Sequence, residues 1–407
     1  MNTLDINSLW MILSILGVFI MIPGIGLFYG GLVRSNHSVS TILKNYIVLG
    51  PCAFLWLFVG YSLVFSSDIG GVIGNLDLLF LNKYLNFPNK LLFVFFQMMF
   101  ALLTVAIISG AVVERIKFKF WIFFGLFWSL LVYYPVAHWV WAENGWIAML
   151  GGKDFAGGLV VHITSGCSAF VAAKAIGRRK DFFKLKKSYN LGKVFLGTAF
   201  LWLGWFGFNA GSSLEFNNIS LYAFFNTFIA GSGAIVGWLL MDYVFTPHRP
   251  SAKGINIAII CGLVGITPAA GFVGLWESAA IGMITAWVCN IGIRYFHSVF
   301  KIDDALDVFV THGIGGFVGA ILTGVFASNL INPSISGGML SGDYSILKGN
   351  LIGGLVVAIY SMVITKLIIV ILSKITPMRV DSEDESVGLD LTQHGENIII
   401  IKDEVIR

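Results

Sequence analysis

Two aspartate and histidine pairs carry the clearest chemical signal in this sequence. Asp154 precedes His162 by eight residues, and Asp304 precedes His312 by the same interval, each pair within a long apolar run. Eight helical residues rise about 12 Å, close to half of a bilayer core of about 30 Å. Each imidazole is therefore predicted near the middle of a membrane, where an ionisable side chain is costly and indicates a functional site.

The composition predicts an all-α polytopic membrane protein. Of the 407 residues, 57% are hydrophobic and 12% are charged, whereas about a quarter of the residues in soluble domains are charged. The net charge of +4 is small and gives no support to nucleic-acid binding. The four cysteines lie in apolar runs without a metal or redox spacing, so we expect no metal and no other cofactor.

Apolar windows bounded by charged or turn residues predict the membrane spans. They indicate eleven transmembrane helices, at approximately 9–32, 40–66, 90–113, 119–141, 155–176, 190–213, 219–245, 254–273, 276–296, 304–328 and 346–374. Residues 1–375 would thus form a transmembrane domain. Residues 376–407 would form a cytoplasmic tail that is either disordered or docked on the inner face.

The basic residues predict the orientation of these spans. Alternate connections carry most of the Lys and Arg residues, including eight between positions 174 and 193. The opposite side has only Lys83, Lys90, Lys153 and Lys348. By the positive-inside rule, the N-terminus lies outside the cell and the C-terminus lies inside it. The protein is predicted to be in the cell inner (plasma) membrane.

The two histidines also predict an internal symmetry. His162 falls in the fifth span and His312 in the tenth, so the two spans cross the membrane in opposite directions. This indicates two inverted five-helix halves, at about 9–176 and 190–328, followed by an extra helix at about 346–374. Transporters built from inverted repeats hold their site at the repeat interface. We expect the histidines to meet there as a neutral pair that bonds a small polar solute or relays a proton.

Other residues could support such a site. Asp154 stands at a predicted helix start, where a carboxylate caps backbone N–H groups, and this role is favoured over direct proton chemistry. Phe208 and Ser212 are four apart and share one helix face. Phe100 and Trp141 lie in the third and fourth spans, although aromatic residues there are more often core residues or interfacial anchors.

Together these segments resemble the ammonium transporter family of bacterial Amt, yeast Mep and animal Rh proteins, and are most similar to the Amt branch. The resemblance covers nearly the whole chain. Its most specific strings are Asp154-Phe-Ala-Gly-Gly-Leu-Val-Val-His162 and Gly204-Trp-Phe-Gly-Phe-Asn-Ala-Gly-Ser212. It implies a homotrimeric ammonium or methylammonium transporter rather than an enzyme, with one hydrophobic pore in each subunit.

The resemblance also implies roles for individual residues. Trp141 and Ser212, with Phe100 beside them, would bind the ammonium cation at the outer mouth. Phe100 and Phe208 would form a stacked gate, and His162 and His312 would line the pore and relay the proton. Asp154 would support the outer site and assist deprotonation. Because the loop before Asp154 departs from the usual family spacing, Trp139 or Trp146 remains an alternative to Trp141.

The predicted tail adds a possible partner. Gly388-Leu-Asp and His394-Gly-Glu resemble the segment through which these transporters contact PII signalling proteins. The alternative is a tail that only braces neighbouring subunits. Two other functions stay open: an ammonium sensor or receptor with little flux, and a membrane electron carrier in which the two histidines ligate haem.

Overall fold

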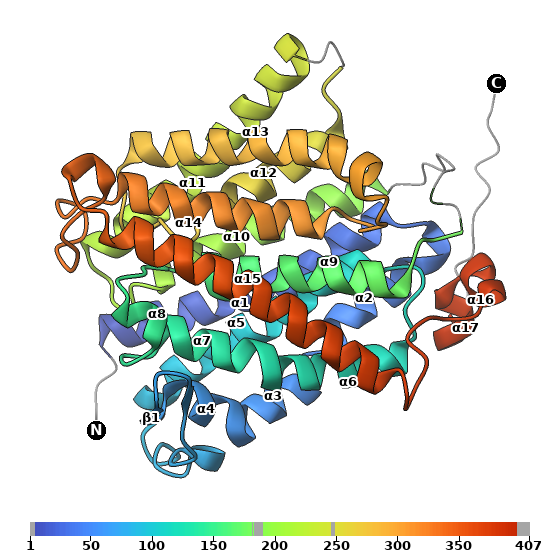
Figure 1. The fold of residues 1–407 in the computed structure, drawn as a ribbon, viewed down its shortest axis with the longest axis horizontal. Coiled ribbons are helices and arrows are strands. Elements are labelled where there is room, and N and C mark those ends of the chain that lie inside the picture. Colours follow the sequence, from blue (N-terminus) through green and yellow to red (C-terminus); the bar gives the residue numbers. More distant parts are fainter. Residues whose placement is uncertain (1–4, 181, 183–189, 246–248, 397–407) are drawn as a thin grey trace.

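The computed structural model describes residues 5–180, 182, 190–245 and 249–396. Long helices run side by side along one direction of the molecule (Figure 1). The α-helices are α1 (Ile6–Leu32), α2 (Ser38–Ile47), α3 (Pro51–Leu55), α4 (Tyr61–Phe65), α5 (Pro88–Val112), α6 (Phe118–Trp128), α7 (Tyr134–Trp141), α8 (Trp146–Met149), α9 (Thr164–Ile176), α10 (Leu191–Gly211), α11 (Asn218–Leu240), α12 (Ala252–Ile266), α13 (Leu275–Phe300), α14 (Gly315–Phe326), α15 (Ser345–Leu372), α16 (Ser382–Val387) and α17 (Leu389–His394).

Shorter elements interrupt or join these helices. π-Helical turns cover Trp56–Gly60 (η2), Ser129–Tyr133 (η4), Gly158–Ile163 (η5), Met241–Phe245 (η6) and Phe309–Ile314 (η7). 3₁₀ turns cover Ser35–His37 (η1), Leu79–Leu81 (η3) and Met339–Ser341 (η8). The strands β1 (Asp68–Ile69) and β2 (Ile73–Gly74) pair antiparallel in a small hairpin.

The predicted membrane fold is confirmed. Ten helical segments of the described residues are long and apolar enough to cross a membrane, and the shorter apolar helix α12 accounts for the eleventh predicted span. The predicted end of that span at residue 273 is wrong, because α12 ends at Ile266 and turns follow. Pro268 explains the early end, since proline cannot donate the next helical hydrogen bond.

Side-chain caps define where several of the long helices begin. The Asp5 carboxylate accepts a hydrogen bond from the backbone N–H of Ser8 at 2.8 Å at the start of α1. Asn217 and Ser220 form a reciprocal capping box at the start of α11. Such caps satisfy N–H groups that have no partner within the helix, so the apolar helices start at defined residues.

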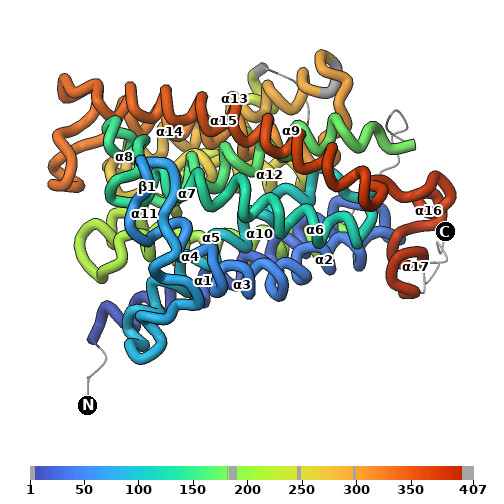
Figure 2. The backbone as a smooth tube through the Cα atoms, turned by 60° about the horizontal axis from the view of Figure 1, so that its bottom comes forward, coloured from blue at the N-terminus to red at the C-terminus, as the bar shows by residue number. Residues whose placement is uncertain are grey.

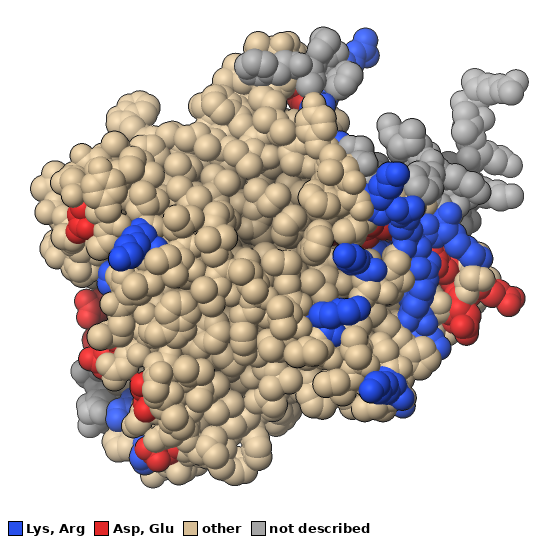
Figure 3. Space-filling model, in the orientation of Figure 1, with Lys and Arg blue, Asp and Glu red and all other residues tan. Residues whose placement is uncertain are grey.

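Charge is segregated to the ends of the bundle. Lys and Arg side chains gather at the end that carries α16 and α17, and a belt of uncharged residues covers the middle of the face shown (Figure 3). The described chain starts at the opposite end (Figures 1 and 2). This distribution is typical of a protein whose middle is embedded in lipid.

The tail is docked on the bundle as far as residue 396. The Asp390 carboxylate accepts hydrogen bonds from the backbone N–H groups of Val39 and Ser40, at 3.1 and 2.7 Å. Leu389 and Asp390 are buried. The docked form of the predicted tail therefore holds for this part, and residues 397–407 lie outside the described residues.

Candidate functional site

Both histidines lie on π-helical turns at the start of their spans. His162 belongs to η5, which continues into α9, and His312 belongs to η7, which continues into α14. π-Helical turns are rare overall, and those that occur are frequently found at functional sites. The two spans thus begin with the same local distortion, as matched positions should.

Asp154 holds the first of these turns in place. Its Oδ1 accepts hydrogen bonds from the N–H groups of Gly157 and Gly158, and its Oδ2 from those of Leu159 and Val160, at 2.6–3.1 Å. All four N–H groups are at the start of η5, where they would otherwise lack a partner. Asp304 acts in the same way at η7, where its Oδ2 accepts from the Phe309 N–H at 2.7 Å.

A close helix crossing brings the two histidines together. Gly166 lies four residues after His162, and Gly316 lies four residues after His312. A Cβ added to Gly166 would lie 2.1 Å from the backbone nitrogen of Gly313. A Cβ on Gly316 would lie 2.8 Å from the Cβ of His162. The backbones can approach this closely only because these positions lack a side chain.

The two imidazoles are in direct contact. The Nδ1 atoms of His162 and His312 are 3.2 Å apart, and the ring centroids are 5.2 Å apart. Both side chains are buried in the protein. The narrow cavity beside them is otherwise lined almost entirely by apolar and aromatic residues, namely Met21, Ile25, Phe28, Tyr29, Leu103, Ile107, Leu201, Trp205 and Ile260.

Two stacked phenylalanines lie next to His162. The rings of Phe100 and Phe208 are 4.3 Å apart between centroids and inclined by 28°. The Phe208 ring lies 6.2 Å from that of His162. Trp141 also contacts Phe100, with centroids 5.7 Å apart and nearly perpendicular planes. The order of rings is therefore Trp141, Phe100, Phe208 and His162.

Ser212 and Trp141 each donate a hydrogen bond to a backbone carbonyl at this site. Ser212 is half-buried and donates its hydroxyl hydrogen to the Phe208 carbonyl at 2.9 Å. Trp141 donates its indole N–H to the Asp154 carbonyl at 3.0 Å. Trp139 instead contacts Trp146 and donates to the carbonyl of Val72. Of the three tryptophans considered from the sequence, Trp141 is thus the one that contacts Phe100.

Comparison with known proteins places this geometry in a family. The model of the Ammonium Transporter Family matches residues 9–398. The chain belongs to the ammonium transporter family. The ammonium transporter of Bacillus subtilis is 42% identical over 397 residues, which cover 96% of this chain and 97% of that protein.

Solved structures of relatives share the fold of this family member. Saccharomyces cerevisiae Mep2 superposes with a TM-score of 0.87 at 34% identity, covering 94% of this chain and 89% of that one. A protein described as a sensor Amt protein superposes with a TM-score of 0.88 at 32% identity, covering 96% and 98%.

Two residues of the histidine site in this ammonium transporter family protein did not stand out in the sequence. Thr267 caps the C-terminus of α12, and its hydroxyl oxygen lies 3.3 Å from Nε2 of His162. Trp205 stacks near the His162 ring, 5.6 Å away between centroids at 26°. Trp205 lies within the quoted Gly204 to Ser212 string, whereas the only signal for Thr267 is a polar residue before a proline in an apolar span.

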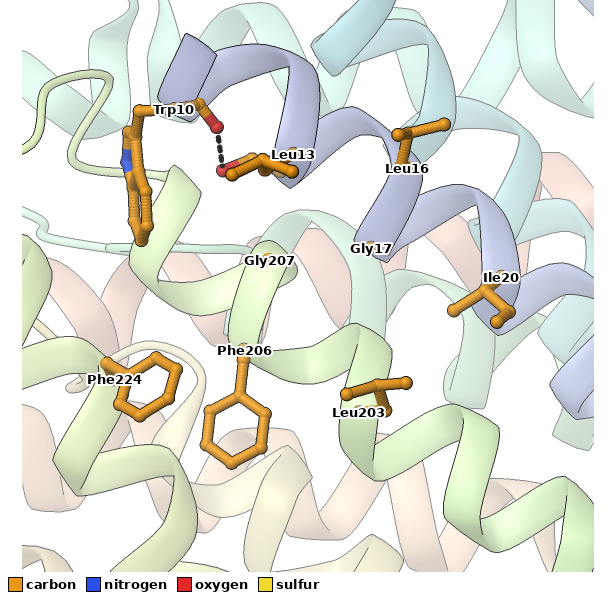
Figure 4. A pocket seen from close by; sticks show the side chains of 10 residues that line it. Trp10, Leu13, Leu16, Gly17, Ile20, Leu203, Phe206, Gly207 and Phe224 are labelled. Atoms are coloured by element: carbon orange, nitrogen blue, oxygen red, sulfur yellow. Dashed lines mark hydrogen bonds between the residues drawn. The ribbon is translucent and has the colours of Figure 1, made fainter. Parts of the chain in front are cut away.

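An apolar groove on the outside of the bundle lies away from this site. It runs between α1 and α10 and is lined by Leu13, Leu16, Ile20, Leu203, Phe206 and Phe224, with Trp10 at one end (Figure 4). Leu13 and Leu203 are more than half exposed. The groove offers little polar chemistry, so the histidine cavity is the better candidate site.

A buried charge network lies at the end that carries the tail. Arg179 donates to Asp303 from Nε and Nη2, at 2.9 and 2.8 Å, and to Glu114 from Nη1 at 3.2 Å. Although burial alone would raise the pKa of each carboxyl, the Arg179 guanidinium holds the pKa of Asp303 and of Glu114 below the usual range. Arg34 bonds Glu114 and also the Glu385 carbonyl, which links this network to α16.

Proposed function

We propose that this protein carries ammonium or methylammonium across a membrane and that His162 and His312 relay the proton. The observation that carries the proposal is the 3.2 Å contact between the two imidazole nitrogens, next to the stacked Phe100 and Phe208. Two neutral imidazoles can each donate and accept a hydrogen bond, so a proton can pass between them without a fixed charge in the pore.

The outer end of the row of rings suits a cation. An aromatic face attracts a cation by about 0.5–2 kcal/mol, and Trp is the best such residue. Because the Ser212 hydroxyl gives its hydrogen to the Phe208 carbonyl, its oxygen is left as an acceptor for the N–H groups of ammonium. Trp141 and Ser212 are therefore the proposed binding residues, with Phe100 beside them.

The gate and the dry cavity would give selectivity. Ammonium and potassium are similar in size, so a ring of carbonyl oxygens would distinguish them poorly. An apolar constriction penalises every charged species. Ammonium can give up a proton and cross as ammonia, whereas potassium cannot, so the stacked Phe100 and Phe208 would select by chemistry.

Asp154 would act by holding other groups. Its two carboxylate oxygens already accept four backbone N–H groups. Its carbonyl accepts the Trp141 indole N–H. Asp154 is therefore proposed as a positioning residue for both η5 and the outer cation site, and its help in deprotonation would come through that geometry and its charge.

Reconstituted liposomes provide the main test. We expect the unsubstituted protein to give saturable methylammonium uptake and an ammonium-dependent current. Replacement of both His162 and His312 by alanine should abolish the proton-coupled current. An unchanged current and selectivity in the double variant would defeat the relay. Empty liposomes and detergent-solubilised thermal unfolding of both proteins control for leak and misfolding.

The same liposomes distinguish transport from sensing. A relative of similar fold is described as a sensor Amt protein, and a sensor could keep the outer site. Ammonium binding without measurable flux would favour the sensor function. A haem carrier is a poor fit, because a macrocycle and its iron have no room between ring nitrogens 3.2 Å apart.

The proposed setting is the cell inner (plasma) membrane, with the N-terminus outside. The concentration of Lys and Arg at the end that carries α16 and α17 supports this orientation (Figure 3). A cysteine introduced at exposed Ser382 should resist a membrane-impermeant thiol reagent in intact cells and react after lysis. Reaction in intact cells would show that the orientation is the opposite of the one proposed.

A homotrimer is the proposed assembly, as the family resemblance implies. The groove between α1 and α10 (Figure 4) offers a second copy an apolar face with exposed Leu13 and Leu203. Filling it by Leu203→Trp should weaken the trimer in native mass spectrometry. A trimer of unchanged stability would place the interface elsewhere.

A PII signalling protein is a proposed partner at the cytoplasmic end. The segment that resembles the PII contact, Gly388 to Asp390, packs against residues 36–40 of its own subunit, a contact that favours neither PII binding nor the bracing of neighbouring subunits. Pull-down of a PII protein by the intact chain, but not by a chain ending near Pro377, would support the partner. Equal capture of the PII protein by the intact and the shortened chain would show that the tail does not contribute to PII binding.

A further inference from the structure

The Thr267 hydroxyl lies among three hydrogen-bonding groups. It donates to the Leu263 carbonyl at 2.7 Å, and it accepts the Trp205 indole N–H at 2.9 Å. Its oxygen is also 3.3 Å from Nε2 of His162. All of these contacts are buried, so water does not compete for them.

The number of hydrogens available determines the direction of each bond. A hydroxyl has one hydrogen and two acceptor lone pairs. The hydrogen of Thr267 is engaged by the short bond to Leu263, and one lone pair is engaged by Trp205. Only the other lone pair remains for His162, so Nε2 of His162 must carry the hydrogen.

The second histidine is constrained by the first. If a neutral His162 is protonated at Nε2, its Nδ1 is bare and can only accept. The Nδ1 of His312, 3.2 Å away, must then be the donor. A neutral His312 protonated at Nδ1 has a bare Nε2, and His312 also lines a second small cavity beside Thr311, away from Phe208.

We propose that Thr267, held by Trp205, is a positioning residue that sets the tautomers of the histidine pair. The inference rests on the proposed relay, because the tautomers decide which nitrogen can take the next proton. Thr267 lies outside the pair, and its contacts determine in which direction the pair is ready to pass a proton.

The proposed transfer moves one proton from ammonium to water through the histidine pair. In the ready form, His162 has a bare Nε2 and His312 carries its hydrogen on Nε2. Ammonium gives a proton to Nε2 of His162, the Nδ1 hydrogen of His162 moves to Nδ1 of His312, and the Nε2 hydrogen of His312 leaves to a water molecule. The products are ammonia, hydronium and the pair with the hydrogens interchanged, which is the arrangement that the Thr267 contacts favour.

The hydroxyl can bond the ready form only by giving up its hydrogen bond to the Leu263 carbonyl. If its hydrogen rotates from the Leu263 carbonyl to Nε2 of His162, Thr267 becomes a donor to the ready form. The bond from Trp205 is compatible with both positions, because it uses a lone pair. Thr267 would therefore favour the interchanged form at rest and still support the return to the ready form.

Nitrogen NMR on the intact protein in lipid bilayers tests the assignment directly. With ¹⁵N-labelled histidine, protonated and bare ring nitrogens give separate signals, and loss of signals in His162→Ala and His312→Ala identifies the pair among the seven histidines. We expect His162 to be protonated at Nε2 and His312 at Nδ1. The opposite arrangement at rest would overturn the proposal.

Conservative variants separate positioning from packing. Thr267→Val keeps the shape and removes the hydroxyl, and should lower the ratio of the two tautomeric arrangements by about fivefold, as expected for one hydrogen bond. Thr267→Ser should restore the ratio. Thr323→Val is the matched control, since Thr323 is a buried threonine that bonds the carbonyl four residues earlier. A Thr267→Val protein with unchanged tautomers would refute the inference.

The NMR result is independent of the proposed transport. A tautomer change in Thr267→Val supports the positioning role even if no protein, substituted or not, gives flux, a result that would instead refute transport. Where flux is present, Thr267→Val should change the proton-coupled current several-fold, because it changes the share of pairs in the ready form, with recovery in Thr267→Ser. Unchanged current beside changed tautomers would show that the tautomer does not limit the relay and would overturn that part of the inference.

Discussion

The crossing of the two histidine helices makes Gly166→Ala the sharpest perturbation of the site. Real Cβ atoms essentially never approach other heavy atoms within 3.0 Å, yet a Cβ at Gly166 would lie 2.1 Å from the nitrogen of Gly313 and 2.4 Å from its Cα. The neighbour is backbone and cannot rotate away. The helices must therefore separate by about 1 Å at this point.

That displacement exceeds what the histidine contact can absorb. Gly313 directly follows His312, whose Nδ1 is 3.2 Å from that of His162, and a further 1 Å takes the pair out of hydrogen-bond range. We expect a loss of about 1–3 kcal/mol in the free energy of unfolding, as for other overpacked cores. The relay current should fall at least tenfold, which would correspond to about 1.4 kcal/mol at the barrier.

The assay is ammonium-dependent current in liposomes beside thermal unfolding in detergent. Gly50→Ala is a matched control, because a Cβ there would meet only one atom, the Ile47 carbonyl oxygen at 3.8 Å. Gly316→Ala should be milder than Gly166→Ala, since its closest contact would be 2.8 Å. A folded Gly166→Ala protein with the current of the unsubstituted chain would refute the argument that the crossing positions the pair.

Two further predictions concern carboxylates. Asp154→Ala leaves four backbone N–H groups of η5 without their acceptor. It should lower the free energy of unfolding by about 2 kcal/mol or more, and Asp154→Asn should lower it less. Equal thermal midpoints for the unsubstituted protein and both variants would contradict the capping role. The pKa values of Asp303 and Glu114 are below the usual range. The stabilisation that these two carboxylates give to the folded protein should therefore be complete above the unfolded carboxyl pKa of about 4. It should be lost as the pH falls through their lower folded pKa values. Hydrogen exchange of α16 and α17 should therefore accelerate in acid, and exchange that is independent of pH, after correction for its intrinsic rate, would rule out this linkage.

The membrane fold could be predicted because its signal is local. A segment of about 20 apolar residues must hydrogen-bond its own backbone in lipid, so composition along one stretch defines a spanning helix. All eleven predicted spans correspond to helices of the structure. The error at the end of α12 arose because the turns after Ile266 are apolar as well, and hydropathy does not distinguish a buried turn from a helix.

The chemical groups of the site were also visible in the sequence, but their contacts were not. His162 and His312 stood out as ionisable residues in apolar spans, and Asp154 as a cap. The choice of Trp141 over Trp139 and Trp146 as the neighbour of Phe100 depends on how α7 packs on α5. Spacing along one helix cannot predict that packing.

Amino-acid sequence by itself determined that this is a membrane protein of eleven spans with two histidines at matched positions, because hydrophobicity and burial cost act on each segment separately. Only the tertiary structure decided that residues 150 positions apart touch through their Nδ1 atoms, that Gly166 permits the approach, and that Thr267 is the third member of the contact. The physical reason is that these contacts form only at ångström-scale distances between helices. Those distances are set by side chains from the whole bundle.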